Sequence, residues 1–392
     1  MKILHIITRL IVGGAQENTL LTCEGLARRG HEVTLLTGPS LGPEGSLMER
    51  AQAGDYRVRV TPHLVRNPHA WHDAAAWRSI RQAIRDTGAE VVHTHSSKAG
   101  IVGRGAAWGM KRRSKNGRPL VVHTIHGLPF HPYQRAAVNR LWIGLERWAA
   151  KRCDAIICVA DAMTRQALAA GVGRPELFTT VYSGMEVGPF VSPGITREEA
   201  RGRLGIPADA YVFGTIARLQ PLKGHDDLRA GAGELFEKVP DAHFLWLGDG
   251  VFRARFEQTI RDRGWGKRFT LAGLVPPGEV PRLLPAMDVL VHPSYREGLA
   301  RALPQALLAG VPVISYDCDG AAEVCIENQT GFLVKTGDGG ALTAAMIRMA
   351  SHRENARTMG AQGRSLCLDR FSAERMVERI AGVYARLGGG RA

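Results

Sequence analysis

The sequence predicts an α/β protein with two doubly wound, Rossmann-like domains. Two observations predict it: short apolar runs of β type alternate with helical stretches, and a segment rich in Gly and Pro interrupts this pattern near the middle of the chain. Such alternation is typical of parallel sheets covered by helices. The length of 392 residues, with 45% apolar and 22% charged residues, suits two globular domains.

The first half opens with a strand predicted at 2–10, a turn at Gly13 and Gly14, and a helix at 16–29. Further strands of this half are predicted at residues 31–37, 90–95, 120–126, 155–159 and 178–182. Helical stretches lie between them, so each strand is expected to run parallel to its neighbours.

The segment 185–197 is predicted to be a linker, after which the alternation restarts. Strands of the second half are predicted at residues 211–217, 243–248, 269–272, 289–292, 311–315 and 332–334. We therefore predict an N-terminal domain over 1–190 and a C-terminal domain over 191–370. Residues 371–392 are predicted to form an amphipathic helix that packs back toward the N-terminal domain, followed by a loose tail.

The net charge of +14 is unevenly distributed. Residues 1–190 hold 25 Lys and Arg against 14 Asp and Glu, and the remainder is nearly neutral, with 26 against 23. A basic first half fits an anionic partner, such as a phospholipid surface, a lipid-linked phosphate or a nucleic acid. A plain basic soluble domain fits it equally well.

Cysteine and hydropathy patterns indicate a cytoplasmic protein. The six Cys follow no CxxC or zinc-binding spacing, which suits a reducing compartment. The apolar N-terminus resembles a signal peptide, but His5 and Arg9 interrupt it. No apolar run reaches about 18 residues, so no membrane span is expected, although peripheral association with the inner membrane face remains open.

Ligands of open α/β sheets bind beyond the carboxyl ends of the strands, so the loops after the strands are the places to inspect. After the strand predicted at 211–217 come Arg218, Lys223 and Gly224, followed by a helix. Two cations and a helix N-terminus suit a diphosphate. An ordinary charged surface loop is the alternative.

After the strand at 289–292, Glu297 precedes a helix predicted to run to about Ala309. A carboxylate at a helix N-terminus can accept hydrogen bonds from sugar hydroxyls while the N–H groups hold phosphate oxygens, or it can simply cap the helix. Pro304 requires either that this helix begins late enough to place it in the first turn, or that the helix bends there.

Six motifs in order resemble the retaining glycosyltransferases of family 4. The run from Glu297 through Gln305 to Val313 resembles the family's Glu-x7-Glu motif. The others are GGA at 13–15, HTIHG at 123–127, VYSGMEV at 181–187, ARLQPLKG at 217–224 and DCDGAAEV at 317–324. The resemblance covers most of the chain. It implies the GT-B fold, two Rossmann-like domains facing a cleft, with the nucleotide-sugar donor bound mainly by the C-terminal domain and the acceptor mainly by the N-terminal domain.

The resemblance also implies roles for individual residues. Arg218 and Lys223 would hold the diphosphate and stabilise it as it leaves, and Glu297 would contact the transferred sugar. The backbone N–H groups of Gly298, Leu299 and Ala300 would lie nearby.

In the first domain, His126 would face the donor sugar, with His95 as a lesser candidate. Gly13 and Gly14 would let the backbone approach the phosphates or the acceptor. Gln305 stands where the family's second acidic residue grips the ribose. An amide can still bond both ribose hydroxyls, but it lacks the strength of a carboxylate, by about 1 kcal/mol or more per bond. Because of this departure, a non-catalytic nucleotide-sugar-binding protein remains an alternative function.

No metal and no cofactor are expected besides the nucleotide sugar as co-substrate. Asp317 and Asp319 resemble a metal-binding Asp-x-Asp, but they follow a strand in a family pattern that uses no metal. The five histidines His93, His95, His123, His126 and His131 are expected on different strands or loops, not in a metal cluster.

A basic stretch at 111–118 and the helix predicted at 133–152, which carries Trp142 and Trp148, are candidates for contact with an anionic membrane surface. A solvated loop is the alternative for 111–118. No aromatic-basic recognition motif accompanies the basic half, so a nucleic-acid partner is not expected.

The sequence therefore predicts a retaining, metal-independent hexosyltransferase of polysaccharide biosynthesis. It would move a sugar from a nucleotide-sugar donor, with UDP favoured, to a saccharide or lipid-linked acceptor. The alternatives are a hydrolysing nucleotide-sugar epimerase of the same fold and a non-catalytic nucleotide-sugar-binding protein.

Overall fold

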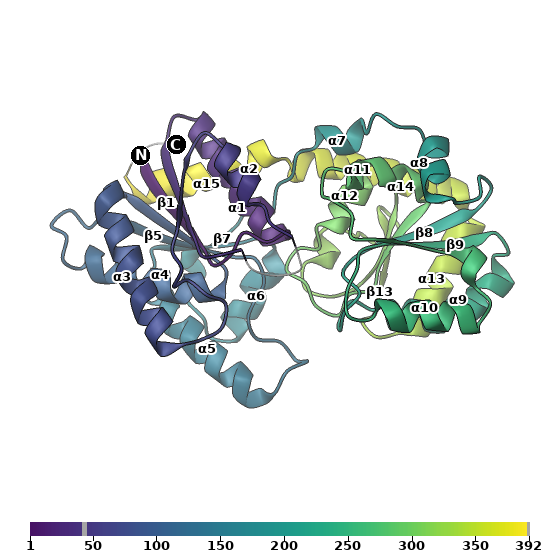
Figure 1. The fold of residues 1–392 in the computed structure, drawn as a ribbon, viewed down its shortest axis with the longest axis horizontal. Helices are drawn as coiled ribbons and strands as arrows, with labels where there is room; N and C mark the ends of the chain where they lie inside the picture. The colour runs from purple at the N-terminus through teal and green to yellow at the C-terminus, as the bar shows by residue number, and fades with distance from the viewer. Residues whose placement is uncertain (41–44, 390–392) are drawn as a thin grey trace. The chain divides into compact units, whose positions relative to one another are not determined.

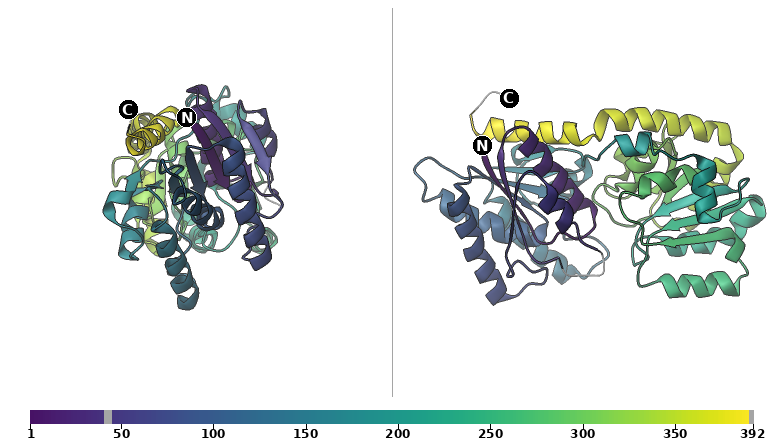
Figure 2. Two further views of the ribbon diagram at one scale, coloured as in Figure 1. Left: turned by 90° about the vertical axis from the view of Figure 1, so that its left-hand side faces the viewer. Right: turned by 45° about the horizontal axis from the view of Figure 1, so that its top comes forward.

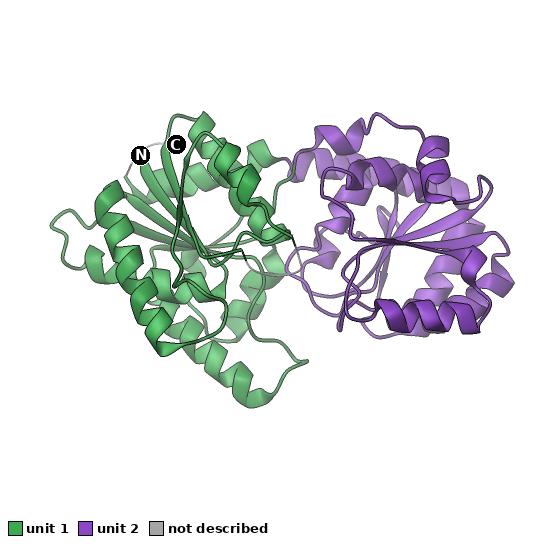
Figure 3. Ribbon diagram, in the orientation of Figure 1, with its two compact units in different colours: residues 1–185, 373–392 green, residues 186–372 purple. Residues whose placement is uncertain are grey.

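The computed structural model describes residues 1–40 and 45–389, which form two compact α/β units (Figures 1 and 3). Unit 1 comprises residues 1–185 and 373–392, and unit 2 comprises residues 186–372. Each unit contains one parallel sheet with helices on both faces (Figure 2), which confirms the predicted fold class. The junctions fall at 185/186 and 372/373, not at 190/191 and 370/371.

The sheet of unit 1 has seven parallel strands in the order β3-β2-β1-β4-β5-β6-β7. Its strands are β1 (Lys2–Ile7), β2 (Glu32–Thr37), β3 (Arg57–Val60), β4 (Val91–His95), β5 (Leu120–Ile125), β6 (Ala155–Cys158) and β7 (Phe178–Thr180). The sequence pattern does not predict β3. Arg57 and Arg59 alternate with valines in this edge strand, which is partly exposed along its whole length.

The helices of unit 1 are α1 (Gly14–Arg28), α2 (Met48–Ala53), α3 (Ala70–Thr87), α4 (Ser97–Lys111), α5 (Ala136–Ala150), α6 (Asp161–Ala169) and α15 (Ala373–Leu387). The last of them, α15, packs against α1 although more than 340 residues separate the two in the chain. Gly25 of α1 allows this close packing, because a Cβ there would lie 2.5 Å from Cγ2 of Val377. The hydroxyl of Tyr384 reaches Nδ1 of His93 in β4 at 2.5 Å.

The sheet of unit 2 has six parallel strands in the order β10-β9-β8-β11-β12-β13. Its strands are β8 (Tyr211–Ile216), β9 (Ala242–Leu247), β10 (Phe269–Gly273), β11 (Val289–His292), β12 (Val313–Tyr316) and β13 (Gly331–Val334). Its longer helices are α8 (Arg197–Leu204), α9 (His225–Lys238), α10 (Arg253–Asp262), α12 (Ala302–Leu308), α13 (Gly339–Ser351) and α14 (Arg353–Arg370). It also contains two single-turn α-helices, α7 (Gly188–Val191) and α11 (Val280–Leu283); α7 lies within the predicted linker.

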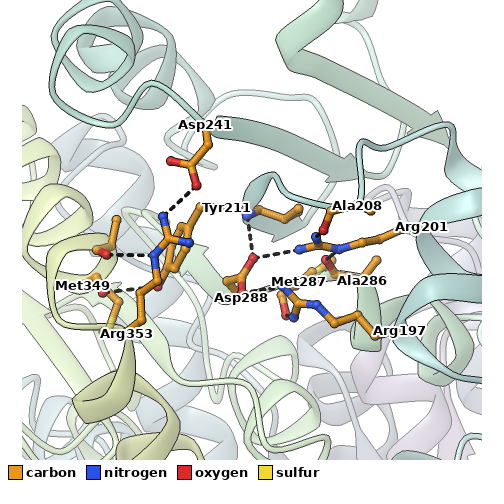
Figure 4. A network of polar contacts seen from close by, with 12 residues as sticks. Arg197, Arg201, Ala208, Tyr211, Asp241, Ala286, Met287, Asp288, Met349 and Arg353 are labelled. Atoms are coloured by element: carbon orange, nitrogen blue, oxygen red, sulfur yellow. Dashed lines mark hydrogen bonds and ion pairs between the residues drawn. The ribbon is translucent and has the colours of Figure 1, made fainter.

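One carboxylate joins three elements at the amino ends of the strands of unit 2 (Figure 4). Asp288, just before β11, accepts hydrogen bonds from Arg197 at 2.6 Å, from Arg201 at 2.9 Å and from the backbone N–H of Val212 at 2.7 Å. It therefore ties α8 to β8 and β11. Ligands of such sheets bind at the opposite, carboxyl ends of the strands, so this network is a structural feature.

Among the described residues, no helix is long and apolar enough to cross a membrane. The predicted C-terminal helix is present as α15. The tail expected to be loose lies partly outside the described residues, since these end at 389.

Candidate functional site

Two loops at the carboxyl edge of the unit 2 sheet lie in direct contact. The loop after β8 contains Leu222 and Gly224, which both have positive φ, 67° and 72°. A Cβ on Gly224 would lie 1.9 Å from the carbonyl oxygen of Pro293, so only glycine fits there. The backbone N–H of Tyr295 donates to the carbonyl of Leu222 at 2.9 Å. The β8 loop is thereby fixed against the β11 loop.

This contact places a lysine, a glutamate and a histidine together. The ammonium of Lys223 pairs with Oε1 of Glu297, and Nε2 of His292 lies 3.2 Å from the same oxygen. The side chains of Lys223 and Glu297 are only 17% and 19% exposed, and that of His292 is 4% exposed. Burial alone would raise the pKa of Glu297, but Lys223 and His292 outweigh it and hold the pKa well below its ordinary value. The carboxylate is therefore ionised at neutral pH.

A third loop, after β12, orients the backbone of the glutamate. Oδ2 of Asp319 accepts from the backbone N–H of Glu297 at 2.6 Å, and the N–H of Gly320 donates to the carbonyl of Gly298 at 3.1 Å. Asp319 is held at φ 49°, in the left-handed region. The carbonyl of Asp317 accepts from Thr336 at 2.7 Å. The two aspartates thus take part in the loop structure itself.

The expectation that Glu297 stands at a helix N-terminus is wrong. The helix α12 begins at Ala302, five residues later, and Pro304 lies in its first turn, where proline is tolerated. The carboxylate of Glu297 is instead bound to Lys223 and His292.

The other predicted donor-site residues of unit 2 lie in the loops after β8 and β11 or in α12. Leu299 and Ala300 are buried in the loop before α12, and Gly298 precedes them. Gln305 is in α12 and half-buried, and its backbone N–H donates to Arg301. Arg218 is exposed in the loop after β8.

In unit 1, the predicted glycines precede or begin α1. Gly13 is the residue before α1, and Gly14 is its first residue. A Cβ on Gly13 would approach Oε1 of Gln16 at 2.8 Å, which is a contact with a flexible side chain and not with backbone.

The histidines of the first half lie on different strands or loops, as expected, but β1, β4 and β5 are adjacent and bring four of them together. His5 of β1, His93 and His95 of β4, and His126 after β5 lie on adjacent strands in one cluster. Nδ1 of His5 is 2.9 Å from Nε2 of His95, and Nδ1 of His95 is 3.1 Å from Nε2 of His126. His123 stands apart from this chain, with Nδ1 at 2.9 Å from the hydroxyl of Thr94.

A pocket of about 230 Å³ lies beside His126 within unit 1. Its lining includes Ser96, His126, Gly127 and Glu146. Glu146 of α5 pairs with Arg104 of α4 at 2.6 Å, and both side chains are almost completely buried. The pocket thus combines hydroxyl, imidazole and carboxylate groups, which suits a ligand rich in hydroxyls.

The sequence analysis did not single out His5, His292 or Tyr384 as site residues. His292 is the last residue of a predicted strand, so the strand-end rule could have flagged it. His5 lies in mid-strand and Tyr384 in the last helix, and no local signal distinguishes either.

Two family models match the chain, Glycosyltransferase Family 4 over residues 12–187 and Glycosyl transferases group 1 over residues 196–366. The chain is 27% identical over 388 residues to the UDP-Gal:alpha-D-GlcNAc-diphosphoundecaprenol alpha-1,3-galactosyltransferase of Escherichia coli, covering 98% of this chain and 96% of that protein. It is 26% identical over 369 residues to a GDP-mannose-dependent alpha-(1-6)-phosphatidylinositol monomannoside mannosyltransferase of Mycolicibacterium smegmatis, covering 90% and 91%.

Solved structures agree in fold. The Anabaena protein HepE in complex with UDP and glucose has a TM-score of 0.80 at 21% identity, covering 98% of this chain and 99% of that chain. Sucrose-phosphate synthase from Thermosynechococcus elongatus has a TM-score of 0.81 at 21% identity, covering 99% of both. With two parallel sheets of the same architecture and family models over both halves, the chain belongs to the glycosyltransferases of the family 4 type, with the GT-B fold.

Proposed function

We propose that this glycosyltransferase is a retaining, metal-independent enzyme that transfers a hexose-type sugar from a nucleotide-sugar donor to a saccharide or lipid-linked acceptor. The observation that carries the proposal is the pairing of Lys223 with Glu297 on adjacent strand-end loops of unit 2. A cation for the diphosphate and a carboxylate for sugar hydroxyls are the two groups that a donor site needs.

In this proposal the donor diphosphate takes Lys223 away from Glu297. The ammonium then neutralises the charge that develops on the leaving nucleoside diphosphate, with Arg218 as a second cation, so a metal ion is not required for that task. Glu297 is left with an oxygen to accept hydrogen bonds from the transferred sugar. Retention of configuration accords with the family. Catalysis would be mainly electrostatic and positional.

The remaining donor contacts are assigned by position. The backbone N–H groups of Gly298, Leu299 and Ala300 lie in the loop that begins at Glu297 and would contact the donor. Gln305 would bond the ribose hydroxyls through its amide. Gly13 and Gly14 would admit the donor phosphates or the acceptor close to the backbone of unit 1.

The nucleotide of the donor and the identity of the acceptor are proposed from the relatives. UDP is favoured because the E. coli relative is named for UDP-Gal and the Anabaena structure contains UDP, although the mycobacterial relative is named for GDP-mannose. We assign the acceptor to the pocket of unit 1 beside His126, which departs from the resemblance, in which His126 faces the donor sugar. Polysaccharide biosynthesis from a lipid-linked acceptor, such as that in the E. coli relative's name, fits this assignment.

Unit 1 also carries a surface suited to an anionic membrane, here called the basic face: the loop at 111–118 and α5. Arg112, Arg113 and Lys115 are exposed in the loop. On α5, the side chains of Leu141 and Trp148 are 61% and 37% exposed. Exposed apolar groups beside arginines are typical of helices that lie in a membrane interface. This surface supports a cytoplasmic enzyme that binds the inner membrane face peripherally.

The test combines donor binding with transfer. UDP-, GDP- and ADP-sugars are compared by thermal shift on the wild type, and the stabilising donor is then incubated with lipid-linked and saccharide acceptors. Lys223→Ala and Glu297→Ala should each lower transfer at least about a hundredfold, the effect of losing a charge contact to the transition state. Lys238→Ala, at the exposed end of α9, is the matched control.

Each rival function predicts a different result. A hydrolysing epimerase converts the donor in the absence of any acceptor. A non-catalytic binding protein is stabilised by the donor but forms no product with any acceptor. Near-normal transfer in both Lys223→Ala and Glu297→Ala would contradict the proposed site.

A further inference from the structure

Three histidines of unit 1 form a hydrogen-bonded chain that leads from the interior to the pocket wall. Its two links are those between His5 and His95 at 2.9 Å and between His95 and His126 at 3.1 Å. His5 and His95 are fully buried, whereas His126 is partly exposed and lines the pocket. At the interior end, Nε2 of His5 is buried and has no hydrogen-bond partner among the described residues.

The two inner rings are neutral. Burial lowers the pKa of His5 to about 3, and burial together with the neighbouring histidines lowers the pKa of His95 well below its ordinary value. A neutral imidazole carries one N–H donor and one lone-pair acceptor on its two nitrogens. Because each link needs one donor and one acceptor, the proton position on one ring determines the positions on the others.

Two alignments satisfy both links, and Nε2 of His5 decides between them. If the rings donate inward, Nε2 of His5 must carry a proton that has no acceptor. If they donate outward, that nitrogen is only an unused lone pair, and Nδ1–H of His5 donates to His95 while Nδ1–H of His95 donates to Nε2 of His126. A buried N–H without an acceptor is rarer than an unused acceptor, so the outward alignment is favoured.

We propose that His5 and His95 are positioning residues that hold His126 as its Nδ1–H tautomer, so that it donates a hydrogen bond to an oxygen of a ligand in the pocket. Free neutral histidine favours the Nε2–H form, so the chain reverses the intrinsic preference. In this state Nδ1 of His126 cannot accept a proton, which excludes it as a general base through that nitrogen. The ligand role rests on the proposed function, but the tautomer does not.

A metal ion is the competing explanation of the cluster. Ring nitrogens of His5, His93 and His95 lie within 4.8 Å of one another. A metal needs a free lone pair from each ligand, but the link between His5 and His95 already uses one. Both nitrogens of His93 are also engaged, with the hydroxyls of Tyr384 at 2.5 Å and Thr124 at 2.7 Å. The contacts therefore favour the hydrogen-bonded chain.

The test reads the tautomer directly. Long-range ¹⁵N–¹H correlation spectra are recorded on the full chain labelled with ¹⁵N-histidine, without donor or acceptor, and the signals of His126 are identified by their loss in His126→Gln. The wild type should show His126 protonated on Nδ1. His95→Phe removes the donor and should return His126 to mainly Nε2–H. His95→Asn places an amide N–H near the lost Nδ1–H and should restore the Nδ1–H form.

His93→Asn is the matched control, since it removes an equally buried imidazole of the same strand that lies outside the chain, and it should leave the tautomer of His126 unchanged. Turnover should fall about tenfold in His95→Phe, the loss of roughly one hydrogen bond, and return to within about threefold in His95→Asn.

An Nε2–H form of His126 in the wild type, or an unchanged tautomer in His95→Phe, would overturn the inference. If His95→Phe does not fold, the wild-type spectrum still decides. Absence of transfer by the wild type would count against the proposed function only, because the spectra require no substrate.

Discussion

Glu297 is kept ionised by two neighbours that come from different parts of the sheet and lower its pKa. Lys223 comes from the loop after β8, and His292 is the last residue of β11. Within residues 1–40 and 45–389, the buried Nδ1 of His292 has no partner, which suits a ring that is protonated on Nε2 and donates a hydrogen bond from that N–H to Glu297. This cluster is therefore charged and organised in the free protein, and in the donor site proposed above that would lower the cost of ordering side chains on binding.

This arrangement predicts how stability depends on pH. Because the pKa of Glu297 is lower in the folded protein, its contribution to stability is complete above the unfolded carboxyl pKa of about 4.3 and is lost as the pH falls below it. Glu297→Gln should lower the free energy of unfolding by about 2 kcal/mol at pH 7, because a buried ammonium loses its partner. The difference from the wild type should shrink as the pH falls from 5 to 3.

Urea unfolding at several pH values measures this difference. Glu237→Gln, which removes an exposed carboxylate of α9, should change stability little at any of them. If the loss of unfolding free energy in Glu297→Gln stayed constant down to pH 3, Lys223 and His292 would not be what lowers the pKa of this carboxylate.

The sequence predicted the individual candidates of unit 2 but not their contacts. Lys223 and Glu297 were identifiable because each follows a predicted strand. Lys223 and Glu297 come together because β8 lies beside β11, and no local sequence pattern predicts the order of parallel strands. The same limit applies to the chain from His5 to His126, which exists only because β1, β4 and β5 are neighbours.

At the scale of elements, twelve strands were predictable from their apolar runs, whereas the exposed edge strand β3 and the start of α12 were not. Eleven of the twelve predicted strands differ from the observed ones by one to three residues at an end, and that at 289–292 agrees completely. The edge strand β3 was missed because arginines alternate with its valines. The start of α12 was misplaced because Pro304 fits either a first turn or a bend, and only the structure distinguishes them.

The network around Asp288 predicts a stability effect separate from ligand binding. Asp288→Asn leaves Arg201, whose side chain is 3% exposed, without its countercharge, and should lower the free energy of unfolding by about 3 kcal/mol. Asp241→Asn breaks a more exposed pair with Arg353, 49% exposed, and should cost no more than about 1 kcal/mol. Chemical denaturation measures both. Equal effects of the two substitutions would contradict the structural role assigned to Asp288.

The packing of α15 on α1 predicts that the effect of Gly25→Ala on the free energy of unfolding changes sign when Val377 is truncated. Gly25→Ala gains up to about 1 kcal/mol of helix propensity, but its Cβ would lie 2.5 Å from the stiff, branched side chain of Val377. Overpacking of this kind costs about 1–3 kcal/mol, so the substitution should destabilise the wild type. In a Val377→Ala background the clash is gone, and Gly25→Ala should become stabilising.

A double-mutant cycle on unfolding midpoints tests this coupling. Gly202→Ala, in α8 where a Cβ would meet no described residue within 4 Å, reports the helix-propensity gain alone. If Gly25→Ala had the same effect in both backgrounds, the two helices would not be packed as described.

At the scale of the whole molecule, unit 1 is built from both ends of the chain and carries most of the excess charge. Its C-terminal helix was predictable from amphipathic spacing, whereas the residues that α15 contacts were not, since Gly25 and Tyr384 carry no local signal of partnership. The asymmetry of 25 cations against 14 anions in residues 1–190 was readable from composition. Which cations are exposed, and beside which apolar groups, required the structure.

The basic face predicts that unit 1 brings the protein to anionic membranes. Arg112, Arg113 and Lys115 are each worth about 1 kcal/mol near an anionic surface, so replacing all three with serine should weaken binding to phosphatidylglycerol-containing vesicles about a hundredfold. Replacing Leu141 and Trp148 with serine should weaken it further, because these exposed side chains of α5 supply apolar contact.

Vesicle sedimentation measures this binding. Replacing Arg203, Lys238 and Lys267 with serine removes the same charge from exposed positions of unit 2 and is the matched control. Binding of the wild type should also fall as salt is raised, because charges near the surface are screened within about 8 Å at physiological ionic strength. If both triple variants lost binding equally, net charge would be responsible. If neither variant lost binding, the basic face would not be a membrane-binding surface. The same would follow if the wild type bound neutral vesicles as strongly as anionic ones.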